Sequence, residues 1–172
     1  YGRKFGPDPA SIKSAMVGGI VMNNASGMSC GTWANSDRML ISGRIVFADG
    51  TVLDTEDPKS RDSFMQSHPE IISGVEALRD EVLADKELSE RIRHKYSIKN
   101  VTGLNLLPLI TFSDPFDIIL HLMVGSEGTL GFLSEVLMNT LKIATLQANA
   151  MVYFKDIAEA ARAVITMRPL GV

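Results

Sequence analysis

Residues 121–136 read HLMVGSEGTLGFLSEV, and three glycines spaced three residues apart separate two apolar runs in this stretch. Gly125, Gly128 and Gly131 do not fit the GxGxxG dinucleotide fingerprint, and no Lys-Ser or Lys-Thr pair follows them to form a P-loop. Glycine still permits positive φ and exposes backbone N–H groups to a ligand. Glu127 would repel a phosphate, so we expect it to accept hydrogen bonds from neighbouring N–H groups or from ligand hydroxyls. By itself, the segment fits a tight turn between buried strands equally well.

A second segment of small residues lies near the beginning of the sequence. Residues 18–27 read GGIVMNNASG, and their adjacent Asn residues tolerate left-handed backbone and supply both donors and acceptors. Upstream, the stretch Pro7-Asp8-Pro9-Ala10-Ser11 favours a rigid extended or turn conformation. Three backbone-rich, weakly charged segments in one chain favour a site for a large polar cofactor over a catalytic cluster.

Composition narrows the class of protein. The chain has 172 residues, about one domain, with 17 Lys and Arg, 20 Asp and Glu and a net charge of −3, so it lacks the basic footprint of a nucleic-acid binder. Its single cysteine, Cys30, excludes an internal disulfide and an all-Cys metal or iron–sulfur site within this segment, and it favours a reducing cytosol. No apolar window approaches the roughly 18 residues of a membrane span. Both ends suggest a piece of a longer protein.

Local patterns predict several elements. Asp49-Gly50 between β-branched runs predicts a β-hairpin over residues 38–54. Residues 58–97 are expected to form two amphipathic helices with a break near Asp85. Residues 129–143 predict a strand or strand pair, residues 148–154 a strand, and residues 156–167 a helix capped by Asp156. The side chains of that last helix that we expect to face inward are Ile157, Ala160, Ala161, Val164 and Ile165.

The histidines are weak candidates for chemistry. His121 could act as a general base near neutral pH, but a half-buried histidine on a strand, satisfied by the backbone, is the favoured interpretation. His94 lies among basic residues and is expected on a solvated helix face. No histidines and carboxylates occur at the spacing of a metal site, so no metal is predicted.

Four motifs in order resemble the FAD-binding domain of the vanillyl-alcohol oxidase / p-cresol methylhydroxylase family. They are residues 7–27 (PDPASIKSAMVGGIVMNNASG), 44–55 (RIVFADGTVLDT), 99–106 (KNVTGLNL) and 124–136 (VGSEGTLGFLSEV). Within this family the chain is most similar to FAD-linked dehydrogenases of D-2-hydroxy acids such as D-lactate and D-2-hydroxyglutarate. The resemblance covers about residues 1–143, with residues 58–97 as a helical insertion.

The resemblance implies an α+β fold, namely the larger subdomain of the two-subdomain FAD-binding fold, with a mixed sheet flanked by helices. Residues 1–145 would form this subdomain, and residues 146–172 would begin a C-terminal substrate, or cap, domain. A smaller subdomain with a pyrophosphate loop resembling PGGGTS would precede Tyr1. The catalytic base would follow Val172, so no catalytic residue is assigned within this chain.

The resemblance also implies which residues bind FAD. Gly18 and Gly19 would let the chain approach the flavin closely, and Glu127 would accept hydrogen bonds. Binding would be noncovalent, with attachment through Cys30 as the less favoured alternative. The implied cofactor-binding residues are Pro9, Ala10, Ser11, Ile12, Lys13, Ser14, Ala15, Met16, Gly18, Gly19, Asn23, Asn24, Ala25, Ser26, Gly125, Ser126, Glu127, Gly128, Thr129, Leu130 and Gly131.

The implied activity is that of an FAD-linked oxidase or dehydrogenase that oxidises a D-2-hydroxy acid by hydride transfer to FAD, with an electron acceptor that the sequence does not identify. We expect the fragment alone to be inactive. The full-length parent would be cytoplasmic or peripheral to the inner membrane, and relatives of this type carry an iron–sulfur cluster outside the matching segment. Two alternatives are an FAD-linked oxidase of another alcohol and a nonenzymatic module whose helices at residues 58–97 bind a partner.

Overall fold

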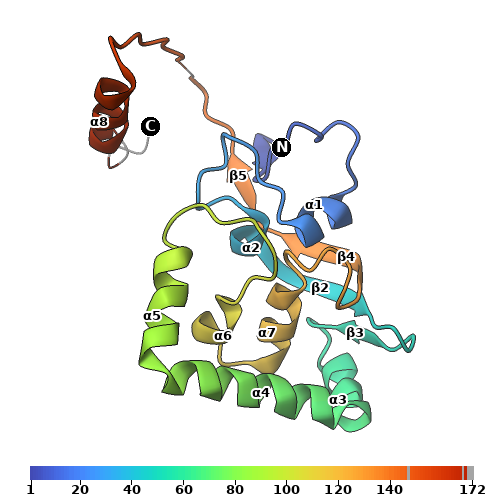
Figure 1. Cartoon of the computed structure of the whole chain (residues 1–172). Helices are drawn as coiled ribbons and strands as arrows, with labels where there is room; N and C mark the ends of the chain where they lie inside the picture. Colours follow the sequence, from blue (N-terminus) through green and yellow to red (C-terminus); the bar gives the residue numbers. More distant parts are fainter. Residues whose placement is uncertain (147, 168, 170–172) are drawn as a thin grey trace. The chain divides into compact units, whose positions relative to one another are not determined.

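The computed structural model describes residues 1–146, 148–167 and 169. The chain divides into two compact units, Tyr1–Lys142 and Ile143–Val172. The first unit contains the strands, the helical segment and all of the motifs quoted above (Figure 1).

A three-stranded antiparallel sheet forms the centre of the first unit. Strand β2 (Leu40–Val46) lies between β3 (Val52–Asp54) and β4 (Phe132–Met138). Ile45 pairs with Leu53 on one side and with Leu133 on the other, and all three side chains are buried. The predicted hairpin is therefore confirmed, and residues 129–143 contain the predicted strand as β4.

The turn between β2 and β3 is built by Asp49. Its carboxylate accepts hydrogen bonds from the N–H (2.9 Å) and the hydroxyl (2.8 Å) of Thr51. His68 Nε2 lies 2.9 Å from the same carboxylate. The bonds from Thr51, followed by that from His68, lower the pKa of Asp49 to about 2. The turn thus fastens the hairpin to the helical segment that follows it.

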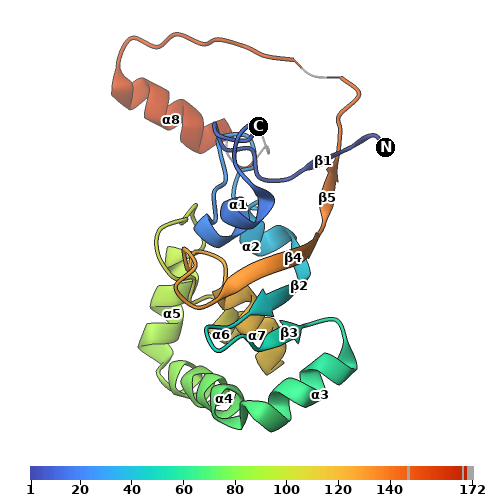
Figure 2. The same ribbon diagram turned by 90° about the vertical axis from the view of Figure 1, so that its right-hand side faces the viewer.

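A second pair of strands joins distant parts of the first unit. Strand β1 (Arg3–Phe5) pairs antiparallel with β5 (Thr140–Lys142), as Figure 2 shows. Two short helices, α1 (Val17–Asn23) and α2 (Ser36–Met39), lie between β1 and β2 in sequence. The α+β class is confirmed. Every strand pair among the described residues is antiparallel, so the parallel pairs that a mixed sheet implies are not found in this part of the chain.

The helical segment contains three helices where two were predicted. They are α3 (Pro58–Ser67), α4 (Pro69–Ala84) and α5 (Lys86–Lys95). The additional break falls at His68, where Pro69 in the sequence indicates a turn, and the His68 backbone leaves the helical region because it precedes that proline. The predicted break is confirmed at Asp85, whose carboxylate caps α5 by accepting a 2.9 Å hydrogen bond from the N–H of Leu88.

Two further helices, α6 (Pro108–Thr111) and α7 (Pro115–Leu122), complete the first unit. The prediction that His121 lies on a strand is wrong, because Asp114 caps a helix that begins at Pro115 and includes His121. A short apolar run cannot distinguish a buried strand from a buried helix. His121 is buried, its Nδ1 lies 2.8 Å from the carbonyl of Asp117, and its ring packs on Phe112.

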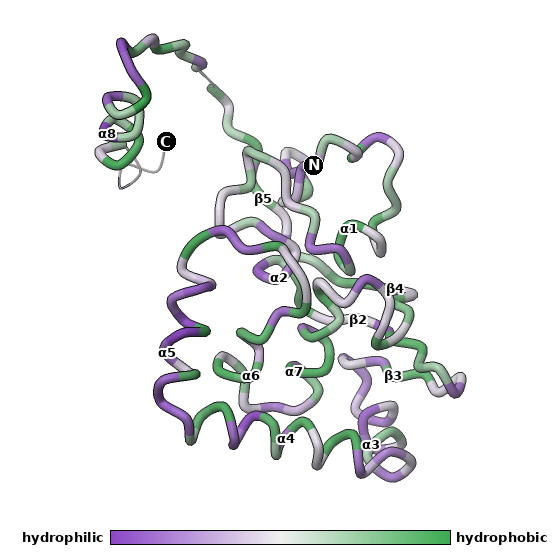
Figure 3. The backbone as a smooth tube through the Cα atoms, in the orientation of Figure 1, coloured by the Kyte–Doolittle hydropathy of each residue, from purple (hydrophilic) through white to green (hydrophobic). Residues whose placement is uncertain are grey.

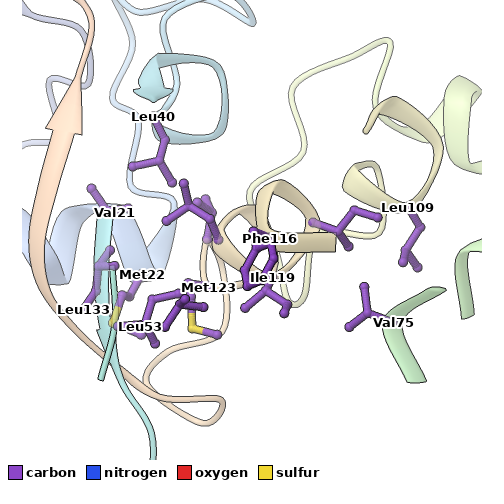
Figure 4. Packing of buried hydrophobic residues seen from close by; sticks show 14 of the residues in the cluster. Val21, Met22, Leu40, Leu53, Val75, Leu109, Phe116, Ile119, Met123 and Leu133 are labelled. Atoms are coloured by element: carbon purple, nitrogen blue, oxygen red, sulfur yellow. The ribbon is translucent and has the colours of Figure 1, made fainter. Parts of the chain in front are cut away.

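The hydrophobic core lies between the sheet and the helices. Figure 4 shows Phe116, Ile119 and Met123 in and just after α7. On one side they meet Leu53 and Leu133 of the sheet, and beyond them lie residues of α4 and α6. Hydrophilic residues gather on the outer helices, especially α5 (Figure 3). The helices at residues 58–97 are therefore amphipathic, as predicted, and cover one side of this core.

The second unit contains helix α8 (Ile157–Met167). Asp156 accepts a 2.7 Å hydrogen bond from the N–H of Glu159, which confirms the predicted helix cap. The prediction of a strand at residues 148–154 is wrong, since these described residues have no partner strand to supply a ladder. The prediction that the apolar side of α8 faces inward is also wrong for this chain, where Ile157, Val164 and Ile165 are exposed. None of the described helices combines the length and the apolar character that crossing a membrane requires.

The low pKa of Asp49 predicts a pH-dependent contribution to stability. The folded-state value of about 2 lies below the unfolded value of about 3.9, so the ionised carboxylate stabilises the fold above the unfolded pKa, and this contribution is lost as the pH falls through the folded pKa. We expect Asp49→Ala to lower the free energy of unfolding at neutral pH, with the deficit shrinking as the pH approaches 2. Urea unfolding across this pH range measures the deficit. An NMR titration midpoint for Asp49 near the unfolded value would contradict the prediction.

Candidate cofactor-binding site

A cavity of about 480 Å³ lies where α1 meets the glycine loop, which is residues 125–131 and precedes β4. This volume is within the usual range of small-molecule sites, about 300–1,000 Å³. Its walls are mainly apolar and include one carboxylate. The lining residues are Met16, Val17, Gly18, Gly19, Met22, Glu127, Gly128, Phe132, Leu133 and Ser134.

Glu127 joins the two sides of the cavity. Its N–H donates a 3.1 Å hydrogen bond to the carbonyl of Met22, and its Oε1 accepts a 2.6 Å hydrogen bond from Nδ2 of Asn23. The backbone of Glu127 is left-handed, with φ of 53°. The Glu127 carboxylate does accept a hydrogen bond, but its donor is the side chain of Asn23, 104 positions away in sequence, and not one of the neighbouring N–H groups that were predicted.

The end of α1 is shaped by the second Asn of the NNASG stretch. Asn24 is left-handed, with φ of 54°, and its N–H donates to carbonyls in the last turn of α1, as does the N–H of Ala25. The carbonyl of Ser26 then accepts a 2.8 Å hydrogen bond from the N–H of Asp8. The Pro-rich lead-in and the Asn turn, quoted separately from the sequence, therefore lie against each other.

Only some of the predicted binding residues reach the cavity. The predicted residues that line it are Met16, Gly18, Gly19, Glu127 and Gly128. Asn23 does not line the cavity but donates a hydrogen bond to the Glu127 carboxylate. Residues 9–15 form a series of turns outside the lining, with Pro9 buried and residues 10–15 exposed.

The other predicted residues also lie outside the lining. Asn24, Ala25 and Ser26 form the turn after α1 and are buried or half-buried. Gly125 and Ser126 are buried at the base of the glycine loop, whereas Thr129, Leu130 and Gly131 follow its tip. The Thr129 hydroxyl donates a 2.6 Å hydrogen bond to the carbonyl of Ser126, which closes the loop on itself.

Sequence reasoning missed part of the lining: Val17 and Met22 of α1, and Phe132, Leu133 and Ser134 of β4. One usable signal was present, because side chains alternate along a strand. With Leu133 turned into the core, Phe132 had to face outward beside the glycine loop, and its side chain is 66% exposed. An exposed aromatic residue next to a ligand loop could have marked this wall.

The cavity offers room to a ligand at two of its glycines. A Cβ atom added at Gly19 or at Gly128 would meet no atom within 4 Å. Oδ1 of Asn24 and Oγ of Ser126 are buried and have no hydrogen-bond partner within the described part of the chain, but neither residue lines the cavity.

The buried cysteine and the two carboxyl groups whose pKa is raised lie outside the cavity lining. Cys30 is buried, its Sγ lies 3.0 Å from Oδ1 of Asn35, and it does not line the cavity. Burial is the main cause that raises the pKa of both Asp37 and Asp117, and neither carboxyl lines the cavity. Among the described residues, no group of three or more His, Cys, Asp and Glu side chains could hold a metal ion.

Comparison with known proteins finds a similarity to an FAD-binding domain. Residues 1–56 match the model of a protein family described as FAD binding domain. The resemblance to an FAD-binding domain is confirmed. The matched range contains the lining residues on the α1 side of the cavity, which are Met16, Val17, Gly18, Gly19 and Met22.

A curated relative supports the same type of protein. The D-2-hydroxyglutarate dehydrogenase of Haemophilus influenzae is 24% identical over 155 residues. The alignment covers 83% of this chain but 14% of that protein, so the chain spans a small part of its relative. No solved structure matches the chain.

The glycine loop allows a matched pair of stability measurements. Gly125 and Gly128 have φ of +84° and +82°, so Ala at either position is strained. A Cβ at Gly125 would also lie 2.4 Å from the backbone carbonyl oxygen of Gly103, whereas Gly128 faces open space. We expect Gly125→Ala to cost about 1–3 kcal/mol more free energy of unfolding than Gly128→Ala. Urea unfolding of the two variants tests this, and equal losses would contradict the crowding at Gly125.

Proposed function

We propose that the first unit binds part of an FAD molecule noncovalently in the cavity between α1 and the glycine loop. One observation carries this proposal: Gly18 and Gly19 converge with Glu127 and Gly128 on one cavity, within a chain whose residues 1–56 match an FAD binding domain. The predicted binding residues outside the lining would act by shaping the Asn turn and the base of the glycine loop.

The residues that line the cavity support noncovalent binding and do not suit the diphosphate of FAD. The lining contains neither His nor Cys, the residues that could form a covalent bond with a flavin. It also contains no Lys or Arg, and Glu127 would repel a diphosphate. One carboxylate oxygen of Glu127 accepts from Asn23, and the other is available to a ligand hydroxyl. The diphosphate would therefore be bound by residues outside this lining.

The remaining domain assignments are part of the proposal. Residues 1–145 would be the larger FAD-binding subdomain, with residues 58–97 as its helical insertion, and residues 146–172 would begin the substrate domain. The order of the four motifs supports the first assignment, and the change of compact unit after Lys142 is compatible with the second.

The parent protein would be a flavin-dependent oxidoreductase that acts on a D-2-hydroxy acid of the D-lactate or D-2-hydroxyglutarate type. Bound FAD would supply the chemistry by accepting a hydride from the substrate. The residues of this chain would position the cofactor: the glycines admit it, the apolar walls exclude water from one side, and Glu127 orients a hydroxyl group. The catalytic base, and an iron–sulfur cluster of the type carried by similar proteins, would lie in the rest of a cytoplasmic or membrane-peripheral parent.

Filling the cavity should remove flavin without unfolding the protein. A side chain at Gly19 has open space around its Cβ, and leucine favours a helix more than glycine does. We expect Gly19→Leu in the full-length parent to lower the flavin-to-protein absorbance ratio at least tenfold, because the new side chain would occupy the cofactor volume.

Gly74→Leu is the matched control for this experiment. Gly74 lies in α4, and a Cβ added there also meets no atom within 4 Å, but it does not line the cavity. Both variants should keep the wild-type circular dichroism spectrum. Full flavin content in Gly19→Leu, or equal loss in both variants, would contradict the proposed site.

The substrate class is tested by reduction of the flavin. We expect the purified parent to be yellow and its visible absorbance to bleach anaerobically with D-lactate or D-2-hydroxyglutarate but not with the L-enantiomers. Bleaching by an alcohol that lacks the carboxylate would instead favour an FAD-linked oxidase of another substrate. A colourless parent that does not take up added FAD would contradict the flavoprotein assignment itself.

A further inference from the structure

An open groove of about 590 Å³ runs along helix α5 and is separate from the cofactor cavity, with which it shares no lining residue. Its floor includes the apolar side chains Leu88, Ile92 and Leu106. Its other lining residues are charged or ionisable and belong to α5: Glu87, Glu90, Arg91, His94 and Lys95. Figures 1 and 3 show α5 on the outside of the first unit, with a strongly hydrophilic outer side.

The charged residues form a stripe in which the sign of the charge changes once. Residues three and four positions apart share a face of a helix, so Glu87, Glu90, Arg91 and His94 lie together. The first two are acidic, Arg91 is basic, and His94 carries an imidazole ring whose N–H can donate a hydrogen bond. None of the four takes part in an ion pair within residues 1–146. The helix dipole favours this order of charges, but it does not account for the groove beside them.

This stripe is complementary to a second copy of itself. We propose that α5 pairs antiparallel with α5 of a second copy of this chain about a two-fold axis. In such an isologous contact each pair of opposing residues occurs twice. With the axis between residues 90 and 91, Glu90 would oppose Arg91 and Glu87 would oppose His94 of the other copy. The Glu90–Arg91 contacts join opposite charges, the Glu87–His94 contacts can each form a hydrogen bond, and the outer ridge of one helix would fill the groove beside the other.

Apolar surface next to the helix would extend the contact. Ile98, Leu104 and Leu106, in the segment between α5 and α6, are 56%, 46% and 41% exposed. A helix of ten residues is only about 15 Å long, so the interface would be at the small end of specific interfaces, below about 1,200 Å² in total. The dimer should therefore dissociate readily, and salt should weaken it by screening the charge pairs.

Charge reversal on the 172-residue chain tests the proposed geometry. Sedimentation equilibrium from micromolar to millimolar protein gives the dimer Kd for each variant. We expect Glu90→Arg and Arg91→Glu each to raise Kd about tenfold, because each reversal turns two attractive contacts into repulsive ones. The double variant Glu90→Arg/Arg91→Glu should recover a Kd within about threefold of the wild type, since the opposing charges are again opposite.

Two controls carry the same charge changes outside the groove. Arg93→Glu lies on the same helix, Glu76→Arg lies on α4, and neither residue lines the groove. Both controls should leave Kd unchanged, and far-ultraviolet circular dichroism establishes that every variant is folded.

Three results would overturn the proposal. They are a wild-type chain that remains monomeric at millimolar concentration, a dimer that Glu90→Arg does not weaken, and a double variant that does not recover. The first would leave the groove to another part of the parent polypeptide or to a different protein. A dimer that Glu90→Arg does not weaken would place the dimer contact on another surface, such as the exposed surface around Phe132 beside the cofactor cavity. The experiment does not depend on FAD, so its failure would leave the proposed function untouched.

Discussion

The antiparallel pairing of β2 with β4 is the contact on which the rest of the first unit depends. It joins residues 40–46 to residues 132–138, and α3 to α7 all lie between these strands in sequence. Closing so long a connection has an entropic cost, which the apolar side chains offset when Ile45, Leu53 and Leu133 meet Phe116 and its neighbours in one core. The helices can form locally, but their place on the sheet follows from this pairing.

The same pairing creates the cavity. The glycine loop ends where β4 begins, so the pairing of β4 with β2 places Glu127 at the end of α1. There Glu127 forms hydrogen bonds with Met22 and Asn23. Both Glu127 and Asn24 are left-handed residues that are not glycine. Such backbone conformations persist where surrounding contacts stabilise them, and they are frequent at functional sites. The site is thus a product of tertiary contacts between two segments, each of which alone would be an ordinary turn.

The helical segment gives the molecule a second surface that is independent of the cavity. The inner sides of α3, α4 and α5 belong to the core through Phe64, Val75 and Ile92, so their packing constrains the fold. The outer side of α5 is free of that constraint, and its charges are available to another molecule. The proposed cofactor site and the proposed association face therefore share no lining residue.

Features determined by neighbouring residues could be predicted from the sequence. The Asp49-Gly50 hairpin turn, the break and cap at Asp85, the cap at Asp156 and the left-handed Asn24 all depend on residues within a few positions, and the structure confirms each of them. The ordered motifs also identified the FAD-binding class, which the family comparison confirms. Local turns and caps can be predicted because their hydrogen bonds and backbone preferences depend on residues within a few positions of one another.

Tertiary structure decided the rest. The apolar run around His121 became a helix because it covers a sheet face, and residues 148–154 form no strand because a strand requires a partner. Only a few residues of the glycine-rich segments line the cavity. Phe132, which was not among the predicted binding residues, also lines it. The sequence alone determined the local turns and caps and the resemblance of this chain to an FAD-binding domain. Which side chains line the cavity was settled by the β2–β4 register, because contacts between residues about one hundred positions apart leave no local pattern.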